Sequence, residues 1–137
     1  MKNNKYYRVY AEINLDAIVK NVDNLMALTK ENTGALAVVK ADGYGHGDVA
    51  VAKAVAQKVT GYAVATLDEA VNLRENGVKK PILVLGYVDP YEFDILVSHE
   101  ITATVFDVET AQLLADAARV QKKQAHCHIK VDTGMRR

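Results

Sequence analysis

The sequence contains very little cysteine. Cys127 is the single cysteine among 137 residues, so no disulfide can form within the chain. A lone thiol fits the reducing environment of the cytosol. We therefore expect a cytoplasmic protein.

Long apolar runs and an excess of charge of one sign are also absent. No apolar run approaches the ~20 residues that span a bilayer, and residues 1–8 are polar, so we expect no secretory or membrane segment. Lys and Arg total 17, and so do Asp and Glu. No net field therefore favours nucleic acid or an acidic membrane surface. Half of the residues are hydrophobic, enough for one globular domain with a sizeable core.

Short apolar or β-branched runs alternate with stretches of helical spacing along the chain. The alternation predicts parallel strands joined by right-handed helical crossovers. An open doubly wound sheet and a (β/α)₈ barrel share this pattern, and spacing alone does not separate them. The predicted strands are residues 11–15, 36–39, 62–65, 82–85, 103–106 and 126–131.

Several helix boundaries are marked by capping residues. Asp16 is a plausible N-cap for the first helix, and residues 66–69 form a capping box in which Thr66 accepts from a first-turn amide and Glu69 reaches back toward the N-cap. Gly77 ends that helix, since glycine adopts the left-handed conformation without strain. Asp89 and the following proline open another helix, and residues 108–121 form the last one.

The last predicted strand has no crossover helix after it. Residues 126–131 read as a strand and 132–137 as the loop that leaves it. A strand of a parallel sheet needs a helix to cover its face. We therefore expect residues 1–137 to be the N-terminal part of a longer protein.

A lysine ends the second predicted strand. Lys40 follows the apolar residues 36–39 and precedes a glycine-rich segment, residues 41–47. In α/β folds the carboxyl ends of the strands face the active site. A lysine that is partly removed from water there favours its neutral amine, the form that reacts with an aldehyde. On position alone, the alternative is a lysine that extends from the strand end into solvent.

The residues around Lys40 resemble a known attachment motif. Residues 37–47, Ala-Val-Val-Lys-Ala-Asp-Gly-Tyr-Gly-His-Gly, are similar to the pyridoxal 5′-phosphate (PLP) attachment motif of the alanine racemase family. Four further segments resemble that family in the same order: 11–17, 65–70, 81–86 and 128–135. The resemblance implies that residues 1–137 are the N-terminal part of a TIM-type α/β barrel domain. In the family, the barrel precedes a β-rich domain that this chain does not contain.

The resemblance also implies roles for individual residues. Lys40 matches the lysine that binds PLP covalently and then acts as one of two bases, and Tyr44 matches a tyrosine that contacts the cofactor phosphate. Arg137 matches an arginine near the cofactor and the substrate carboxylate. Lys130 matches a lysine that carries a carbamate in some members and positions that arginine. Arg136 departs from the family, in which this residue is usually small or polar, and it could compete with Arg137.

The implied activity is the interconversion of L-alanine and D-alanine for cell-wall precursors by a homodimer. In the family the second base is a tyrosine from the partner subunit, outside this chain, so we expect the 137-residue chain alone to be inactive. A racemase for serine or another amino acid is an alternative, decided by pocket residues that lie mostly beyond residue 137. Val38 and Leu85 match family positions that line the pocket. A non-catalytic PLP-binding barrel protein is a third possibility, against which the motif around Lys40 argues.

Other patterns have weaker interpretations. His126 and His128 share one strand face and could hold a metal, but no companion ligands are identifiable, so we expect no metal site. Cys127, on the opposite face, is predicted to be a small core residue. The three glycines of residues 43–47 could offer amides to a phosphate, although a tight strand-to-helix turn is favoured. His46 is predicted to be structural.

Overall fold

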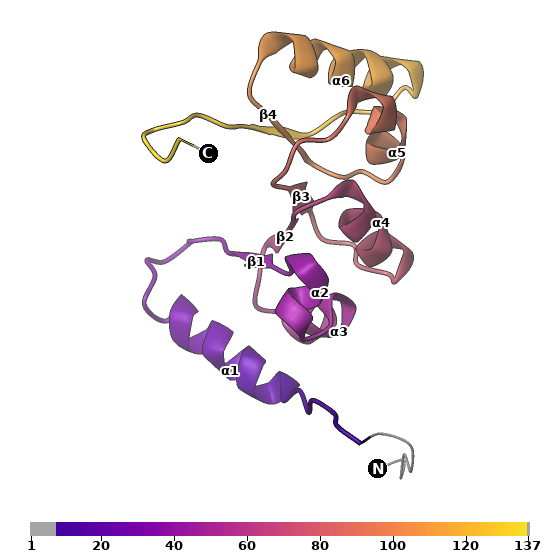
Figure 1. Cartoon of the computed structure of the whole chain (residues 1–137). Coiled ribbons are helices and arrows are strands. Elements are labelled where there is room, and N and C mark those ends of the chain that lie inside the picture. The colour runs from indigo at the N-terminus through magenta and orange to yellow at the C-terminus, as the bar shows by residue number, and fades with distance from the viewer. Residues whose placement is uncertain (1–7, 137) are drawn as a thin grey trace.

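The computed structural model describes residues 8–136, in which helices and strands alternate (Figure 1). The strands are β1 (Leu36–Val38), β2 (Gly61–Val64), β3 (Ile82–Val84), β4 (Ala103–Val105) and β5 (Cys127–Ile129). The helices are α1 (Leu15–Met26), α2 (Lys40–Gly45), α3 (Asp48–Ala54), α4 (Leu67–Glu75), η1 (Pro90–Glu92), α5 (Phe93–Ser98) and α6 (Val108–Val120).

Each strand lies beside the strand that follows it in sequence. β1 pairs with β2, β2 with β3, and β4 with β5, all in parallel, and a parallel bridge from Leu83 to Thr102 joins β3 to β4. A doubly wound sheet reverses its strand order at a switch point, whereas this order does not reverse. Of the two architectures that the spacing left open, the strand order is that of a barrel wall. Figure 1 shows α3, α4 and α5 on the same side of the strands.

The core lies between the middle strands and these helices. Every residue of β2 and β3 is buried, and Leu73 of α4 and Leu96 of α5 are fully buried against them. Tyr62 is also buried, and its hydroxyl donates to the carbonyl of Ala52 at 2.6 Å, the partner that a buried phenol needs. All three residues of β5 are exposed. No helix among residues 8–136 has the length and apolar character to cross a bilayer.

The first predicted strand, residues 11–15, is wrong. Residues 11–14 form no strand, and Leu15 already belongs to α1. The predicted cap is also wrong, because Asn14 rather than Asp16 is the N-cap, with its side-chain oxygen accepting from the Ala17 amide at 2.9 Å. Asn14 has extended backbone angles and lies three residues before that amide, as capping requires. Asp16 lies inside the first turn, where its charge favours the helix dipole.

The other predicted helix boundaries are confirmed. Thr66 caps α4 by accepting from the Glu69 amide, and Gly77 follows that helix with φ +88°. Asp89 accepts from the Tyr91 amide, and its neighbour Pro90 opens the short helix η1 that continues into α5. The prediction of residues 108–121 differs from α6 by one residue.

Candidate active site

Residues at the carboxyl ends of β1, β2, β3 and β5 line a cleft of about 510 Å³. Its volume falls in the range of roughly 300–1,000 Å³ that is typical of small-molecule sites. Lys40 follows β1, Leu85 follows β3 and Lys130 follows β5, and parallel pairing brings these ends to one edge of the array. The other lining residues are Ala65, Gly86, Val131, Asp132, Thr133 and Met135.

Lys40 is half-buried and begins a left-handed turn. The φ angles of the four residues 41–44 lie between +52° and +60°. This conformation costs about 1–2 kcal/mol for each residue that carries a Cβ. The Gly43 amide donates to Val39 O at 2.9 Å, and the Gly47 amide donates to Asp42 O at 2.8 Å. Because these amides are paired within the turn, the predicted strand-to-helix turn is confirmed for this segment.

The structure brings some of the predicted site residues together. Lys40 and Lys130 line the same cleft, as does Leu85, whereas Val38 and Tyr44 do not. Tyr44 lies on the left-handed turn and is 59% exposed. Arg137, which the resemblance matches to an arginine near the substrate carboxylate, lies outside the described residues.

Two side chains of the turn and its neighbouring loop hold backbone atoms. His46 Nδ1 lies 3.1 Å from the carbonyl oxygen of Gly43, which agrees with the structural role predicted for it.

Asp132 Oδ1 accepts from the amides of Arg136 at 3.0 Å and Gly134 at 2.9 Å. These amides, and to a smaller extent the charge of Lys130, hold the pKa of Asp132 below its ordinary value. Asp132 is therefore an anion that lines the cleft with two lysines, a feature that the sequence analysis missed.

Glu69 was assigned only a capping role from the sequence. Its carboxylate instead accepts from two backbone amides near the cleft, those of Ala41 and Ala65, both at 2.7 Å. Ala41 follows Lys40, and Ala65 follows β2. The pattern of residues 66–69 predicts the helix start and contains no signal for the contact with Ala41, which lies 28 residues away.

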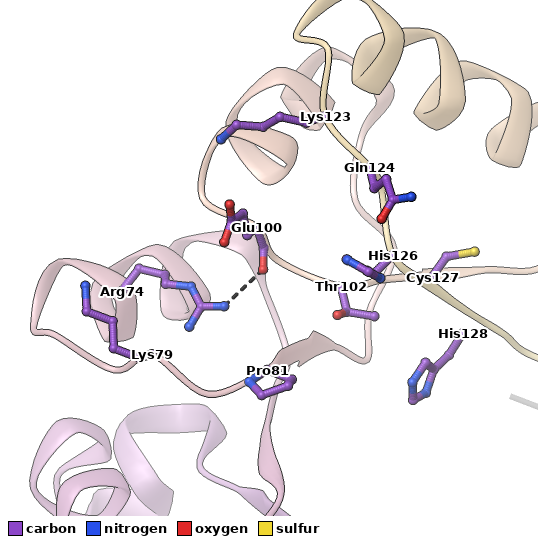
Figure 2. Close-up of a pocket in the computed structure, with 10 residues that line it drawn as sticks. All are labelled: Arg74, Lys79, Pro81, Glu100, Thr102, Lys123, Gln124, His126, Cys127 and His128. Carbon is purple, nitrogen blue, oxygen red and sulfur yellow. Dashed lines mark hydrogen bonds between the residues drawn. The ribbon is translucent and has the colours of Figure 1, made fainter.

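A second cleft, of about 600 Å³, lies at the opposite ends of the strands (Figure 2). Pro81, Thr102 and His126, which line it, immediately precede β3, β4 and β5.

Cys127 is exposed, so its predicted place in the core is wrong, because β5 is the outer strand of the described array. His128 also lines this cleft. Among residues 8–136, no three His, Cys, Asp or Glu side chains are grouped to hold a metal ion. The described residues therefore supply no third ligand to a metal site at His126 and His128.

Comparison with known families identifies the domain. The model of the family described as "Alanine racemase, N-terminal domain" matches residues 13–137. The chain belongs to this family. Alanine racemase 1 of Bacillus subtilis (strain 168) is 46% identical over 140 residues, which cover 100% of this chain and 35% of the relative. Alanine racemase 1 of Oceanobacillus iheyensis is 43% identical, with coverage of 100% and 37%.

Solved structures agree with this assignment. The alanine racemase of Clostridium difficile 630 superimposes with a TM-score of 0.93 at 41% identity, over 96% of this chain and 35% of that protein. A histidine racemase from Leuconostoc mesenteroides subsp. sake gives a TM-score of 0.82 at 29% identity, over 90% and 33%. The predicted fold is confirmed as part of a parallel α/β barrel of this family. The chain spans about a third of the length of the relatives that it matches.

Proposed function

We propose that the protein containing this chain is a PLP-dependent racemase that interconverts L-alanine and D-alanine, with Lys40 as the residue that binds the cofactor. The observation that carries the proposal is the half-buried primary amine of Lys40, at the end of β1 in a cleft of about 510 Å³, in a chain of the alanine racemase family. The cleft and the amine fit an aldehyde cofactor. When bound, PLP spreads the negative charge that develops as the substrate Cα loses its proton.

The residues of this chain have distinct roles in the proposal. The Lys40 amine, once free of the cofactor, takes or returns the proton at one face of Cα. The hydroxyl of Tyr44 holds the cofactor phosphate, and Arg137 holds the substrate carboxylate through two parallel hydrogen bonds. We also propose that a carbamate on Lys130 supplies an anion that positions Arg137, because two cations held close together repel each other.

The rest of the proposal concerns the whole protein. A base for the other face of Cα lies outside residues 1–137, and we propose that a partner subunit of a homodimer supplies it. The product D-alanine would supply cell-wall precursors in the cytoplasm. The likeness to a histidine racemase supports a second candidate function, racemisation of a different amino acid on the same barrel.

Covalent labelling tests the role of Lys40. In the whole protein, reduction with borohydride in the presence of PLP should attach the cofactor to the peptide that contains Lys40. Lys40→Ala should lose both the label and the turnover of alanine. Lys130→Ala is the matched control, because it removes the other lysine of the cleft: it should keep the label while turnover falls, with partial recovery on adding chloride or a small carboxylate.

Three outcomes would each contradict a part of the proposal. A label on Lys53 or Lys58 instead of Lys40 would refute the attachment site. Faster racemisation of serine or histidine than of alanine, measured with each L-amino acid in turn, would show that alanine is not the preferred substrate. Full turnover in Lys130→Ala would assign a structural role to that lysine.

A further inference from the structure

One carboxylate joins the ends of two neighbouring strands beside Lys40. Glu69 lies in the first turn of α4 and is half-buried. Its Oε1 atom accepts from the Ala41 amide, and its Oε2 atom accepts from the Ala65 amide, both at 2.7 Å. Hydrogen bonds to a charged carboxylate are shorter and stronger than those between neutral groups. Both oxygens of Glu69 are thus used to hold backbone groups at the edge of the cleft.

Capping of α4 does not account for this arrangement. In a capping box the glutamate side chain returns to the amide of the N-cap residue, here Thr66. The Glu69 carboxylate goes one residue further, to Ala65, and across to Ala41 in a different part of the fold. The cap itself is made by the Thr66 hydroxyl. The hydrogen bond to Ala41 therefore stabilises the segment that contains Lys40 rather than the start of α4.

That segment has a strained backbone. Ala41 is the first of five consecutive residues with positive φ, residues 41–45, and three of the five carry a Cβ. Such a conformation persists only where the surroundings hold it. The turn starts directly after Lys40, so it sets the direction in which the Lys40 side chain leaves β1. Lys40 and Ala65 both line the cleft, so a bond that fixes the Ala41 and Ala65 amides to one carboxylate fixes Lys40 relative to the end of β2.

We propose that Glu69 is a positioning residue for Lys40: it anchors the Lys40–Ala41 peptide to the end of β2 and holds the amine in place for the cofactor and for the proton at Cα. The inference rests on the proposed role of Lys40. Glu69 touches neither cofactor nor substrate in this scheme, and it acts through the backbone.

The test compares Glu69→Gln with two control variants of the whole protein. Glutamine has the same length, but it offers one acceptor oxygen, and its NH₂ group faces an amide donor, so one of the two bonds is lost. Asp68→Asn removes a negative charge from the same turn of α4. Thr66→Ala removes the hydroxyl cap. Both controls leave the Glu69 carboxylate in place. Glu69→Asp is the second test variant, which keeps the charge but is too short to span both amides.

The first readout needs no cofactor. Hydrogen exchange of the peptide amides around residues 40–44, followed by mass spectrometry, should accelerate about tenfold or more in Glu69→Gln, the change expected when one charge-assisted hydrogen bond is lost. The same amides should exchange at the unchanged rate in Asp68→Asn. Unchanged exchange around Ala41 in both Glu69 variants would overturn the anchoring.

The second readout is kinetic. Glu69→Gln should slow borohydride-trapped attachment at Lys40 and lower kcat about tenfold, while KM stays within about twofold. If Thr66→Ala lowers kcat as much as Glu69→Gln does, Glu69 serves only the helix, and the inference is overturned. Absence of label on Lys40 in the unsubstituted protein would instead refute the proposed function, whatever the exchange data show for Glu69.

Discussion

Arg74 shows how one side chain can organise several loops. Its guanidinium donates to four backbone carbonyls, those of Val78, Lys80, His99 and Glu100, at distances between 2.7 and 3.0 Å. Burial lowers the pKa of Arg74 from its ordinary value, and the negative charge of Glu100 partly opposes this effect. The side chain nevertheless stays charged, because an arginine guanidinium keeps its proton in proteins. Arg74 thus joins the end of α4 to the segments that lead into β3 and β4.

Replacing this arginine should destabilise the protein. We expect Arg74→Lys to lower the free energy of unfolding of the whole protein by roughly 2–4 kcal/mol, because one ammonium group cannot reach all four carbonyls. Arg119→Lys is the matched control. Arg119 pairs with Asp116 on the exposed face of α6, so its replacement should change the free energy by less than about 0.5 kcal/mol. Urea unfolding measures both, and equal effects of the two variants would contradict the role assigned to Arg74.

At the scale of elements, α2 is the unusual one. It is a left-handed turn between β1 and α3, stabilised by the internal bonds of Gly43 and Gly47 and by the side chain of Asp42, which accepts from the Asp48 amide at 3.1 Å. The glycines of this turn differ in their surroundings. A Cβ atom on Gly43 would lie 3.2 Å from the Asp48 backbone nitrogen, whereas one on Gly45 would meet nothing within 4 Å.

This difference predicts an order of stability. Gly45→Ala should lower the free energy of unfolding by about 1–2 kcal/mol, because alanine is disfavoured at the φ of +81° that Gly45 adopts. Gly43→Ala should cost about 1–3 kcal/mol more, since its Cβ also crowds the start of α3. The two variants can be compared by thermal unfolding of the whole protein. A larger loss of stability in Gly45→Ala would show that the short distance from the Gly43 position to the Asp48 backbone nitrogen does not determine the cost at residue 43.

At the scale of the molecule, the two outer strands of the described array are open. Leu36 and Val38 of β1 are 40% and 43% exposed, and Ile129 of β5 and the adjacent Val131 are 79% and 71% exposed. Strand edges with apolar side chains are sites of association. In the whole protein, the rest of the barrel is expected to cover them.

The 137-residue chain on its own should therefore associate and should not racemise alanine. Light scattering of the isolated chain should report species larger than one chain, and an assay for D-alanine should detect no enzymatic turnover. Ile129→Lys, which adds a charge to the exposed outer strand, should reduce the association. A monomeric chain with robust turnover would contradict this prediction, and would require a second base within residues 1–137.

Several features of this protein follow from the sequence because they depend on neighbours a few residues apart. Thr66 caps a helix through the amide three residues ahead, and Gly77 ends that helix through its own backbone freedom. The motif of residues 37–47 identified the family, which the comparison confirmed. One local prediction was wrong: residues 11–15 alternate apolar and polar side chains, a pattern that suits a strand, but Asn14 caps α1 and Leu15 is the first residue of that helix.

The tertiary structure decided what depends on residues far apart. The order of the strands, which separates a barrel from a doubly wound sheet, comes from pairing across crossovers. Lys40 and Lys130, 90 positions apart in the sequence, share a cleft because parallel pairing brings the strand ends to one edge. The Glu69 carboxylate contacts Ala41 for the same reason. Local sequence specifies backbone conformation and caps, whereas strand register and packing determine which distant groups meet, so the cleft and its positioning carboxylate could be found only in the folded chain.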